Sequence, residues 1–122
     1  MISKGEQLLL EVLDQELPSQ PVIKQKPIKV GKKTLYFDFY LPLLKIAFEY
    51  DGVQHFRFTE WFHGTLLNFN KSKQNDRDKE EYCNIHKITL MRIPYTIIDK
   101  DTMKQEIRRF IKAVAFDSPI YN

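Results

Sequence analysis

The sequence contains a single cysteine, Cys83, and no long apolar run. One thiol cannot build the disulfide framework of a small secreted domain. No segment approaches the roughly 20 apolar residues that span a bilayer, and we recognise no leader. We therefore expect an intracellular protein in a reducing compartment, without a membrane span. Cys83 lies in a helical pattern, where a free cysteine is expected in the core rather than as a nucleophile.

Signatures of several common function classes are also missing. The chain has no P-loop, cysteine-rich zinc site or Ser-His-Asp order, and no internal repeat, low-complexity tract or interdomain linker. The net charge is only +3, which permits a nucleic-acid partner but does not argue for one. With 122 residues and 43% hydrophobic content, the chain is predicted to form a single globular domain over residues 1–122.

Apolar periodicity and turn residues predict the element order α-β-β-β-α-β-α. Ser3 followed by Glu6 indicates a capping box at the start of the first helix. Tyr82, Cys83 and Ile85 are expected on the buried side of the second helix. The predicted fold class is α/β (α+β), a small mixed β-sheet flanked by helices. The predicted elements are helices over 3–16, 71–87 and 99–115, an edge segment over 22–30, two strands within 35–56 and a strand over 88–93.

The stretch from Leu35 to Phe56 is predicted to form two strands around a turn at Pro42–Lys45, because residues alternate in character on both sides. With a four-residue turn, Asp38 stands opposite Glu49. One face of this hairpin is then almost wholly apolar and is expected to pack on a helix. Its residues are Leu35, Phe37, Phe39, Ile46, Phe48 and Tyr50.

The opposite face carries Asp38, Glu49 and Asp51. Like charges at neighbouring strand positions destabilise a sheet, so adjacent carboxylates need a compensating partner. A divalent cation is one such partner, since carboxylate oxygens are natural ligands of Mg²⁺ and Mn²⁺. The alternative is the solvated polar face of a two-sided hairpin, because structural charge clusters can mimic sites.

His55 is a candidate for a catalytic or ligand-binding role, and two neighbouring segments are open to two interpretations. His55 directly follows the acidic strand, where an imidazole can exchange a proton near neutral pH. The aromatic connection over 57–70 either contacts nucleic-acid bases or closes a satellite core. The lysines within 18–33 either follow a phosphate backbone or solvate an edge strand.

Five segments carry a family resemblance and cover most of the chain, from Ser3 to Tyr95. They are SKGE, FDFYLP, FEYDGVQHF, NDRDKEEYC and ITLMRIPY, and FDFYLP followed by ExDGxQH is the specific part. Together and in this order they resemble the PD-(D/E)XK (restriction-endonuclease-like) nuclease superfamily. They look most like small phage and bacterial members related to the very short patch repair endonuclease.

The resemblance implies a restriction-endonuclease-like core and roles for matching positions. Asp38 resembles the central metal-binding aspartate, and Glu49 matches the acidic residue of the (D/E)XK element. The carbonyl of Tyr50 would add a metal ligand. Glu6 resembles the first-helix glutamate that completes the site in many members. Asp76 resembles an acidic position on the following helix that related nucleases use.

Asp51 departs from the general motif, because it falls where the usual lysine would stand. An aspartate cannot supply a fixed positive charge, so His55 or Lys79 would take over part of that role. Asp51 or His55 would orient or deprotonate the attacking water, and His55 would alternatively protonate the leaving oxygen. The predicted catalytic residues are therefore Asp38, Glu49, Asp51, His55 and Glu6.

The implied activity is that of a Mg²⁺- or Mn²⁺-dependent endodeoxyribonuclease, which nicks or cuts DNA; RNA is a further candidate substrate. Specificity would come from loops, a homodimer or a partner protein. We expect the protein in the cytoplasm of a bacterial host, and a phage is a candidate source of its gene. The alternatives are a non-catalytic nucleic-acid-binding module and a phage protein-interaction subunit. The predicted nucleic-acid-binding residues are Gln54, Arg57, Trp61, Lys71, Lys73, Arg77 and Lys79, the last two placed near the helix start.

Overall fold

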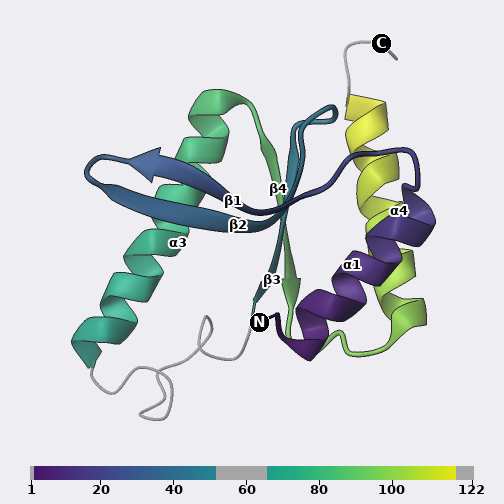
Figure 1. The fold of residues 1–122 in the computed structure, drawn as a ribbon, viewed down its shortest axis with the longest axis horizontal. Helices are drawn as coiled ribbons and strands as arrows, with labels where there is room; N and C mark the ends of the chain where they lie inside the picture. Colours follow the sequence, from purple (N-terminus) through teal and green to yellow (C-terminus); the bar gives the residue numbers. More distant parts are fainter. Residues whose placement is uncertain (1, 52–65, 118–122) are drawn as a thin grey trace. The chain divides into compact units, whose positions relative to one another are not determined.

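The computed structural model describes residues 2–51 and 66–117, which form a mixed α+β structure with a four-stranded sheet (Figure 1). In these ranges the predicted order of helices and strands is confirmed. The elements are α1 (Lys4–Glu16), β1 (Ile23–Val30), β2 (Lys33–Leu41), β3 (Ile46–Asp51), α3 (Leu66–His86), β4 (Thr89–Pro94) and α4 (Lys100–Asp117).

The chain divides into two compact units by its contacts. One unit is Met1–Ser19 together with Thr96–Asn122, and the other is Gln20–Tyr95. The first therefore combines both ends of the chain, and the second is continuous in sequence. The expected single domain over residues 1–122 stays a prediction.

The first unit contains α1 and α4, which pack on each other. The predicted start of α1 is confirmed, since the N–H of Glu6 donates to Oγ of Ser3 at 3.1 Å. Asp99 caps α4 in the same way: its carboxylate accepts from the N–H of Thr102 at 2.8 Å, which lowers the pKa of Asp99. The buried apolar residues of the two helices are Leu9, Val12, Leu13, Met103 and Ile107.

The second unit contains the sheet, with strand order β1-β2-β3-β4. The pairs β1/β2 and β2/β3 are antiparallel, whereas β3/β4 is parallel. A parallel pair needs a crossover connection, and α3 lies in the segment that makes it. The sheet is therefore mixed, as predicted.

The β2–β3 hairpin has the predicted turn and register. The strands end and begin on either side of Pro42–Lys45. Phe39 pairs with Phe48. The next pair in this register is Asp38 and Glu49, as expected for a four-residue turn.

The predicted apolar face is not continuous along β2. Phe39 is buried and pairs with Phe48, whereas Leu35 and Phe37 belong to a core cluster with Ala47, which points to the opposite face of β3 from Phe48. The expectation that these three β2 side chains share one face is therefore wrong. The β1/β2 pairing is interrupted at Gln25, whose φ of 50° is left-handed, and the hairpin is twisted (Figure 1). Such a local distortion redirects the side chains on its two sides.

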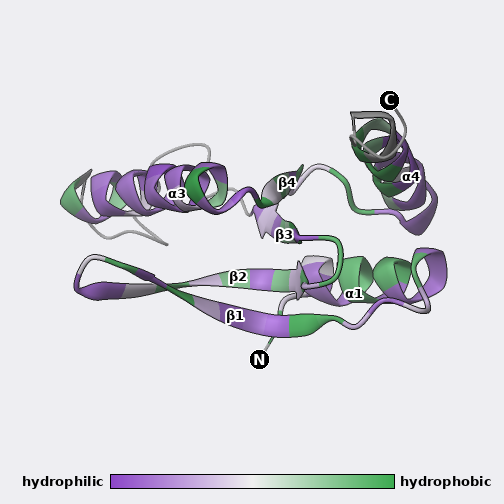
Figure 2. Ribbon diagram, turned by 90° about the horizontal axis from the view of Figure 1, so that it is seen from above, coloured by the Kyte–Doolittle hydropathy of each residue, from purple (hydrophilic) through white to green (hydrophobic). Residues whose placement is uncertain are grey.

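The α3 helix is longer than predicted and hydrophilic along most of its length (Figure 2). It begins at Leu66 rather than Lys71, since no proline or glycine interrupts the residues between them. Residues 76–79 therefore lie in its middle, not near its start. Cys83 is buried as predicted, but Ile85 is 67% exposed because it points away from the stripe that contacts the sheet.

The lysine-rich strand β1 is an edge strand. Lys24 and Lys29 are exposed on it, and Pro27 lies between them. Lysine and proline on an edge discourage pairing with other chains, which favours the edge-strand interpretation of these lysines. Their contact with a phosphate backbone stays a prediction.

Candidate functional site

The acidic side chains of β3 are almost completely buried. Glu49 is 3% exposed and Asp51 is 4% exposed, whereas Asp38 on β2 is half-buried. The interpretation of this face as a solvated polar surface is therefore wrong for β3. A buried carboxylate loses its hydration and needs hydrogen bonds or a cation in its place.

Asp38 and Glu49 are fixed by hydrogen bonds to the backbone of the neighbouring strand. The N–H of Asp38 donates to Oε2 of Glu49 at 3.0 Å, and the N–H of Tyr50 donates to Oδ2 of Asp38 at 2.8 Å. Where the regular pairing of β2 and β3 ends, these two N–H groups thus donate to side-chain oxygens instead of backbone carbonyl oxygens. Hydrogen bonds of this kind orient a carboxylate and stabilise its charge.

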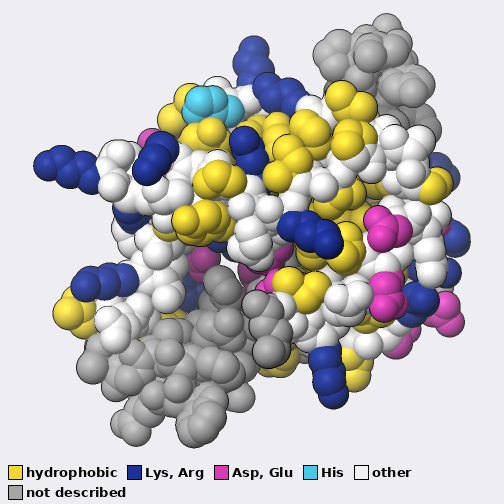
Figure 3. Space-filling model, in the orientation of Figure 1, with side chains coloured by type: hydrophobic (Ala, Val, Ile, Leu, Met, Phe, Trp, Pro, Cys, Tyr) yellow, Lys and Arg dark blue, Asp and Glu magenta, His cyan; other side chains and the backbone are white. Residues whose placement is uncertain are grey.

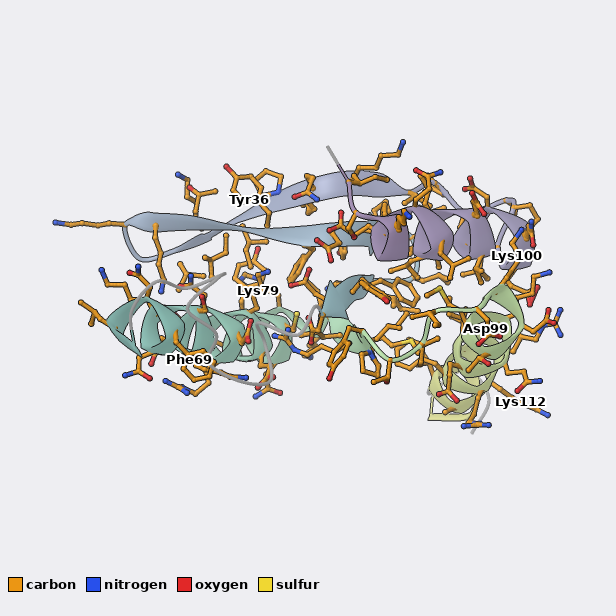
Figure 4. The ribbon with its side chains drawn as sticks, turned by 90° about the horizontal axis from the view of Figure 1, so that it is seen from below. Tyr36, Phe69, Lys79, Asp99, Lys100 and Lys112 are labelled. Carbon is orange, nitrogen blue, oxygen red and sulfur yellow. The ribbon has the colours of Figure 1, made fainter. Side chains whose placement is uncertain are left out.

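Lys79 reaches this pair from α3. Its side chain extends from the helix toward the strands (Figure 4) and forms an ion pair with Oε1 of Glu49. Only 14% of the Lys79 side chain and 4% of the Glu49 side chain is exposed. Lys79, one of the two residues expected to take over the role of the missing lysine, therefore lies beside the carboxylates, while its chemical role stays a prediction.

Arg92 of β4 holds the remaining carboxylates. Its Nη1 lies 3.3 Å from Oδ1 of Asp51 and 3.7 Å from Oδ1 of Asp76, and its Nη2 donates to the Asp76 carbonyl at 3.0 Å. Its Nε lies 3.4 Å from Oε1 of Glu80. Burial disfavours the charged guanidinium, but the negative charges of Asp51, Asp76, Glu49 and Glu80 outweigh burial and raise the pKa of Arg92.

Sequence reasoning missed Arg92. A signal was present, because Arg92 is the single charged residue in the strand TLMRIP. A charged residue in a strand expected to be buried requires a partner of opposite sign. The partners lie on β3 and α3, so no sequence spacing identified them.

A pocket of about 310 Å³ opens beside the carboxylate pair, between the β1–β2 hairpin and α3. Asp38, Asp76 and Lys79 lie on its wall. The rest of the wall combines the polar side chains of Gln25, Thr34, Ser72 and Asn75 with Leu35 and Tyr36. Asp38, Asp76 and the ammonium of Lys79 are therefore open to a solute from this side, whereas Glu49 is buried.

Lys33 connects the hairpin to α3 at this pocket. Its ammonium donates to Oδ1 of Asn75 at 2.8 Å and lies 2.5 Å from Oδ2 of Asp78. The hydrogen bond from Lys33, followed by one from Gln74, lowers the pKa of Asp78. These contacts fix the distance between the hairpin and the helix.

The residues fit a metal ion only in part. Within residues 2–51 and 66–117, no three Asp, Glu, His or Cys side chains are grouped so that they could hold an ion. The predicted convergence of three carboxylates is wrong, because Asp51 faces Arg92. Asp38 and Glu49 remain adjacent, and Mg²⁺ commonly takes one or two carboxylates with water and substrate phosphate. This pair fits such a shared site; the ligand role of the Tyr50 carbonyl stays a prediction.

The other predicted site residues are spread over the chain. Glu6 belongs to the first unit. Lys71 and Arg77 are exposed on α3, and the ammonium of Lys73 lies 5.7 Å from the centroid of the Phe69 ring. On the face shown in Figure 3, basic side chains project separately rather than as one patch. Outside the described residues lie Gln54, His55, Arg57 and Trp61.

Comparison with known proteins finds viral relatives. The chain is 34% identical over 87 residues to uncharacterized protein 307L of Invertebrate iridescent virus 6, covering 69% of this chain and 44% of that protein. It is 28% identical over 79 residues to uncharacterized protein 033L of Invertebrate iridescent virus 3, covering 65% and 40%. It is 35% identical over 68 residues to uncharacterized protein 094L of Frog virus 3 (isolate Goorha), covering 55% and 44%. No family model and no solved structure matches the chain.

The chain spans less than half the length of each of these relatives. They are proteins of viruses of invertebrates and frogs, so they give no support to the expected bacterial host or phage origin. In the part of the chain that the structure describes, no helix has the length and apolar character needed to cross a membrane.

Proposed function

We propose that the protein is a metal-dependent nuclease of the PD-(D/E)XK type, which hydrolyses phosphodiester bonds of DNA with Mg²⁺ or Mn²⁺. The observation that carries the proposal is the meeting of Asp38, Glu49 and Lys79, which come from β2, β3 and α3. Asp38 and Lys79 lie on the wall of an open pocket, and the buried Glu49 contacts Lys79. Two oriented carboxylates beside an ammonium supply the charges that phosphate hydrolysis requires.

Asp38 and Glu49 would hold the metal ion together with the substrate phosphate. Such an ion, when bound, lowers the pKa of water and stabilises the charge that develops on the phosphate. The N–H groups of Tyr50 and Asp38 keep the two carboxylates in place. Because both lie on paired strands, this geometry is set before the substrate arrives.

Lys79 would supply the positive charge that Asp51 cannot. Its ammonium contacts Glu49 at the pocket wall, from where it can donate a hydrogen bond to a phosphate oxygen or to the attacking water. A charge in a poorly hydrated site acts more strongly than one in bulk water. His55 is the second candidate for moving a proton in this mechanism.

Arg92 is a positioning residue in this proposal. It offsets the charges of Asp51 and Asp76, which would otherwise repel a phosphate from the pocket. It also fixes β4 to α3 through the Asp76 carbonyl. Both effects act on the site without contact between Arg92 and the reacting atoms.

A nucleic-acid-binding module without catalysis is the second candidate. The observation that favours it is that Glu49 and Asp51 each have a cationic partner, which accounts for their burial without a metal. Such a module would bind DNA in a salt-dependent manner and would give no product with any divalent metal.

The test is cleavage of supercoiled plasmid by the whole chain in Mg²⁺, in Mn²⁺ and in EDTA. We expect nicked or linear product only with metal. Asp38→Asn and Lys79→Met should each reduce the rate by about 100-fold or more, the usual cost of removing one group that stabilises developing charge. The product form separates nicking from double-strand cutting, which a homodimer with two sites could perform.

Matched controls are Asp101→Asn and Lys112→Met, which remove the same charges from exposed positions on α4. Both should cut at the wild-type rate, and circular dichroism should give the same spectrum for all variants. Product that forms equally well with Asp38→Asn would overturn the site. Salt-dependent binding without cleavage would favour the second candidate.

A further inference from the structure

A second pocket, of about 250 Å³, lies on α3 closer to its C-terminal end, within the unit Gln20–Tyr95. None of the roles proposed above uses it. Its wall combines aromatic rings of β2 and α3 with basic side chains from β1, the β2–β3 turn and α3. The residues that matter here are Lys26, Phe37, Tyr40, Lys45, Tyr82 and His86.

The aromatic part of the wall is a set of rings in mutual contact. Phe37 is fully buried, and its ring centroid lies 6.3 Å from those of Tyr40 and Tyr82. Both tyrosines are half-buried. The Tyr82 ring also lies 4.1 Å from the exposed ring of His86, tilted by 31°. The pocket thus offers aromatic surface backed by the buried ring of Phe37.

The basic part of the wall lies around these rings. The ammonium of Lys45 donates to the backbone carbonyl of His86 at 2.8 Å, which holds it at the C-terminal end of α3. That contact uses one of its three N–H donors, so two can serve an anion. Lys26 adds a second ammonium group to the lining. Burial, with smaller effects of Tyr82 and Cys83, raises the pKa of Tyr40, so its hydroxyl stays neutral beside an anion.

We propose that this pocket binds one nucleotide, with the base against Tyr82 and His86 and the phosphate at Lys45 and Lys26. Aromatic rings beside cations match the two chemical parts of a nucleotide. The volume is below the roughly 300–1,000 Å³ of pockets for drug-sized ligands, which suits a single base. The relevance of this pocket to cleavage rests on the proposed nuclease function, whereas the proposal that it binds a nucleotide does not.

The position of the pocket indicates an unpaired nucleotide of a strand. Tyr82 follows Lys79 by three residues, so both lie on the same face of α3, about 4.5 Å apart along the helix axis. A strand with one base in this pocket can therefore continue toward Glu49. A paired base is stacked inside a duplex and cannot present its face to Tyr82 in this way.

The test measures binding in EDTA, where metal-dependent cleavage cannot interfere. Fluorescence anisotropy with a labelled oligothymidylate would compare the wild type with Tyr82→Leu, which keeps apolar volume but removes the ring. We expect binding about 5- to 100-fold weaker, the loss of one stacked base. Lys45→Met should reduce the slope of log K against log salt by about 0.7, the value for one phosphate contact on a single strand.

The matched control is Tyr95→Leu, a partly exposed tyrosine that does not line this pocket. Binding of a duplex should not respond to Tyr82→Leu. Competition by thymidine monophosphate distinguishes a free nucleotide from a nucleotide within a strand. If the monophosphate displaces the oligothymidylate strongly, and only when Tyr82 is present, the ligand is a free nucleotide. Equal oligothymidylate affinity of the wild type, Tyr82→Leu and Tyr95→Leu would overturn the proposal. Because this binding test is run in EDTA, loss of cleavage by Asp38→Asn bears only on the proposed nuclease and not on this pocket.

Discussion

At the scale of single residues, Arg92 has the largest structural role in the acidic site. It is mostly buried and lies within 4 Å of carboxylate oxygens of Asp51, Asp76 and Glu80. Removing one member of a buried ion pair leaves the other charge without compensation, which costs far more than the pair contributes. The stability of the unit Gln20–Tyr95 should therefore depend on this side chain.

We predict that Arg92→Met lowers the free energy of unfolding by about 3–5 kcal/mol, the usual cost of an uncompensated buried charge. Urea denaturation followed by circular dichroism would measure the change. Arg77→Met, at an exposed position on α3, should stay within about 0.5 kcal/mol of the wild type. The double variant Arg92→Met with Asp51→Asn should recover part of the loss. A loss below about 1 kcal/mol for Arg92→Met would contradict the assignment.

Cys83 gives a second prediction at this scale. Burial, modified by the charges of Arg92 and Glu49, raises its pKa from 9.0 to about 11. Because the thiolate is the reactive form, the folded protein should react slowly with iodoacetamide at pH 8 and rapidly in urea. The folded protein keeps a proton that the unfolded chain releases. The stability linked to this proton is therefore complete below pH 9 and decreases as the pH rises from 9 to 11. Equal labelling rates with and without urea would contradict this prediction.

At the scale of helices and strands, the sequence predicts the features that depend on residues close together in the chain. The order of elements, the turn at Pro42–Lys45 and the pairing register follow from alternation and chain continuity. The position of Asp38 next to Glu49 follows from that register. The ion pairs of Lys79 and Arg92 do not, because α3 and β4 meet β3 only in the tertiary structure.

The distortion of the β1–β2 hairpin was also beyond sequence reasoning. Gln25 has a left-handed φ of 50°, although nothing in its side chain requires that conformation. The left-handed region costs a residue with a Cβ roughly 1–2 kcal/mol, and glycine avoids this cost. The split of the apolar face between Phe37 and Phe39 therefore originates in the backbone, where sequence patterns carry little information.

We predict that Gln25→Gly leaves stability unchanged or raises it by up to about 1 kcal/mol, because relief of strain offsets the entropy cost of glycine. Lys24→Gly, at the preceding exposed position with an ordinary φ, should instead lower stability by about 0.5–1 kcal/mol. Thermal unfolding of both variants would measure the difference. A loss for Gln25→Gly as large as that for Lys24→Gly would show that the observed φ carries no strain.

At the scale of the whole molecule, the proposed chemistry belongs to the continuous unit Gln20–Tyr95. Asp38, Glu49, Lys79 and Arg92 all lie in it, as does the proposed nucleotide pocket. The viral relatives are more than twice as long as the segments that match this chain. The additional residues of these relatives are the first place to look for a segment that gives such a site its substrate specificity.

The helical unit has a different relation to the chain, because α1 and α4 come from its two ends. Its formation closes a loop that contains the whole sheet unit. The entropy of loop closure grows only with the logarithm of loop length, so doubling the enclosed segment costs about 0.6 kcal/mol. Insertions between α1 and α4 should therefore lower the stability of this helix pair only slightly. A deletion that removes either end of the chain would remove one of the two helices.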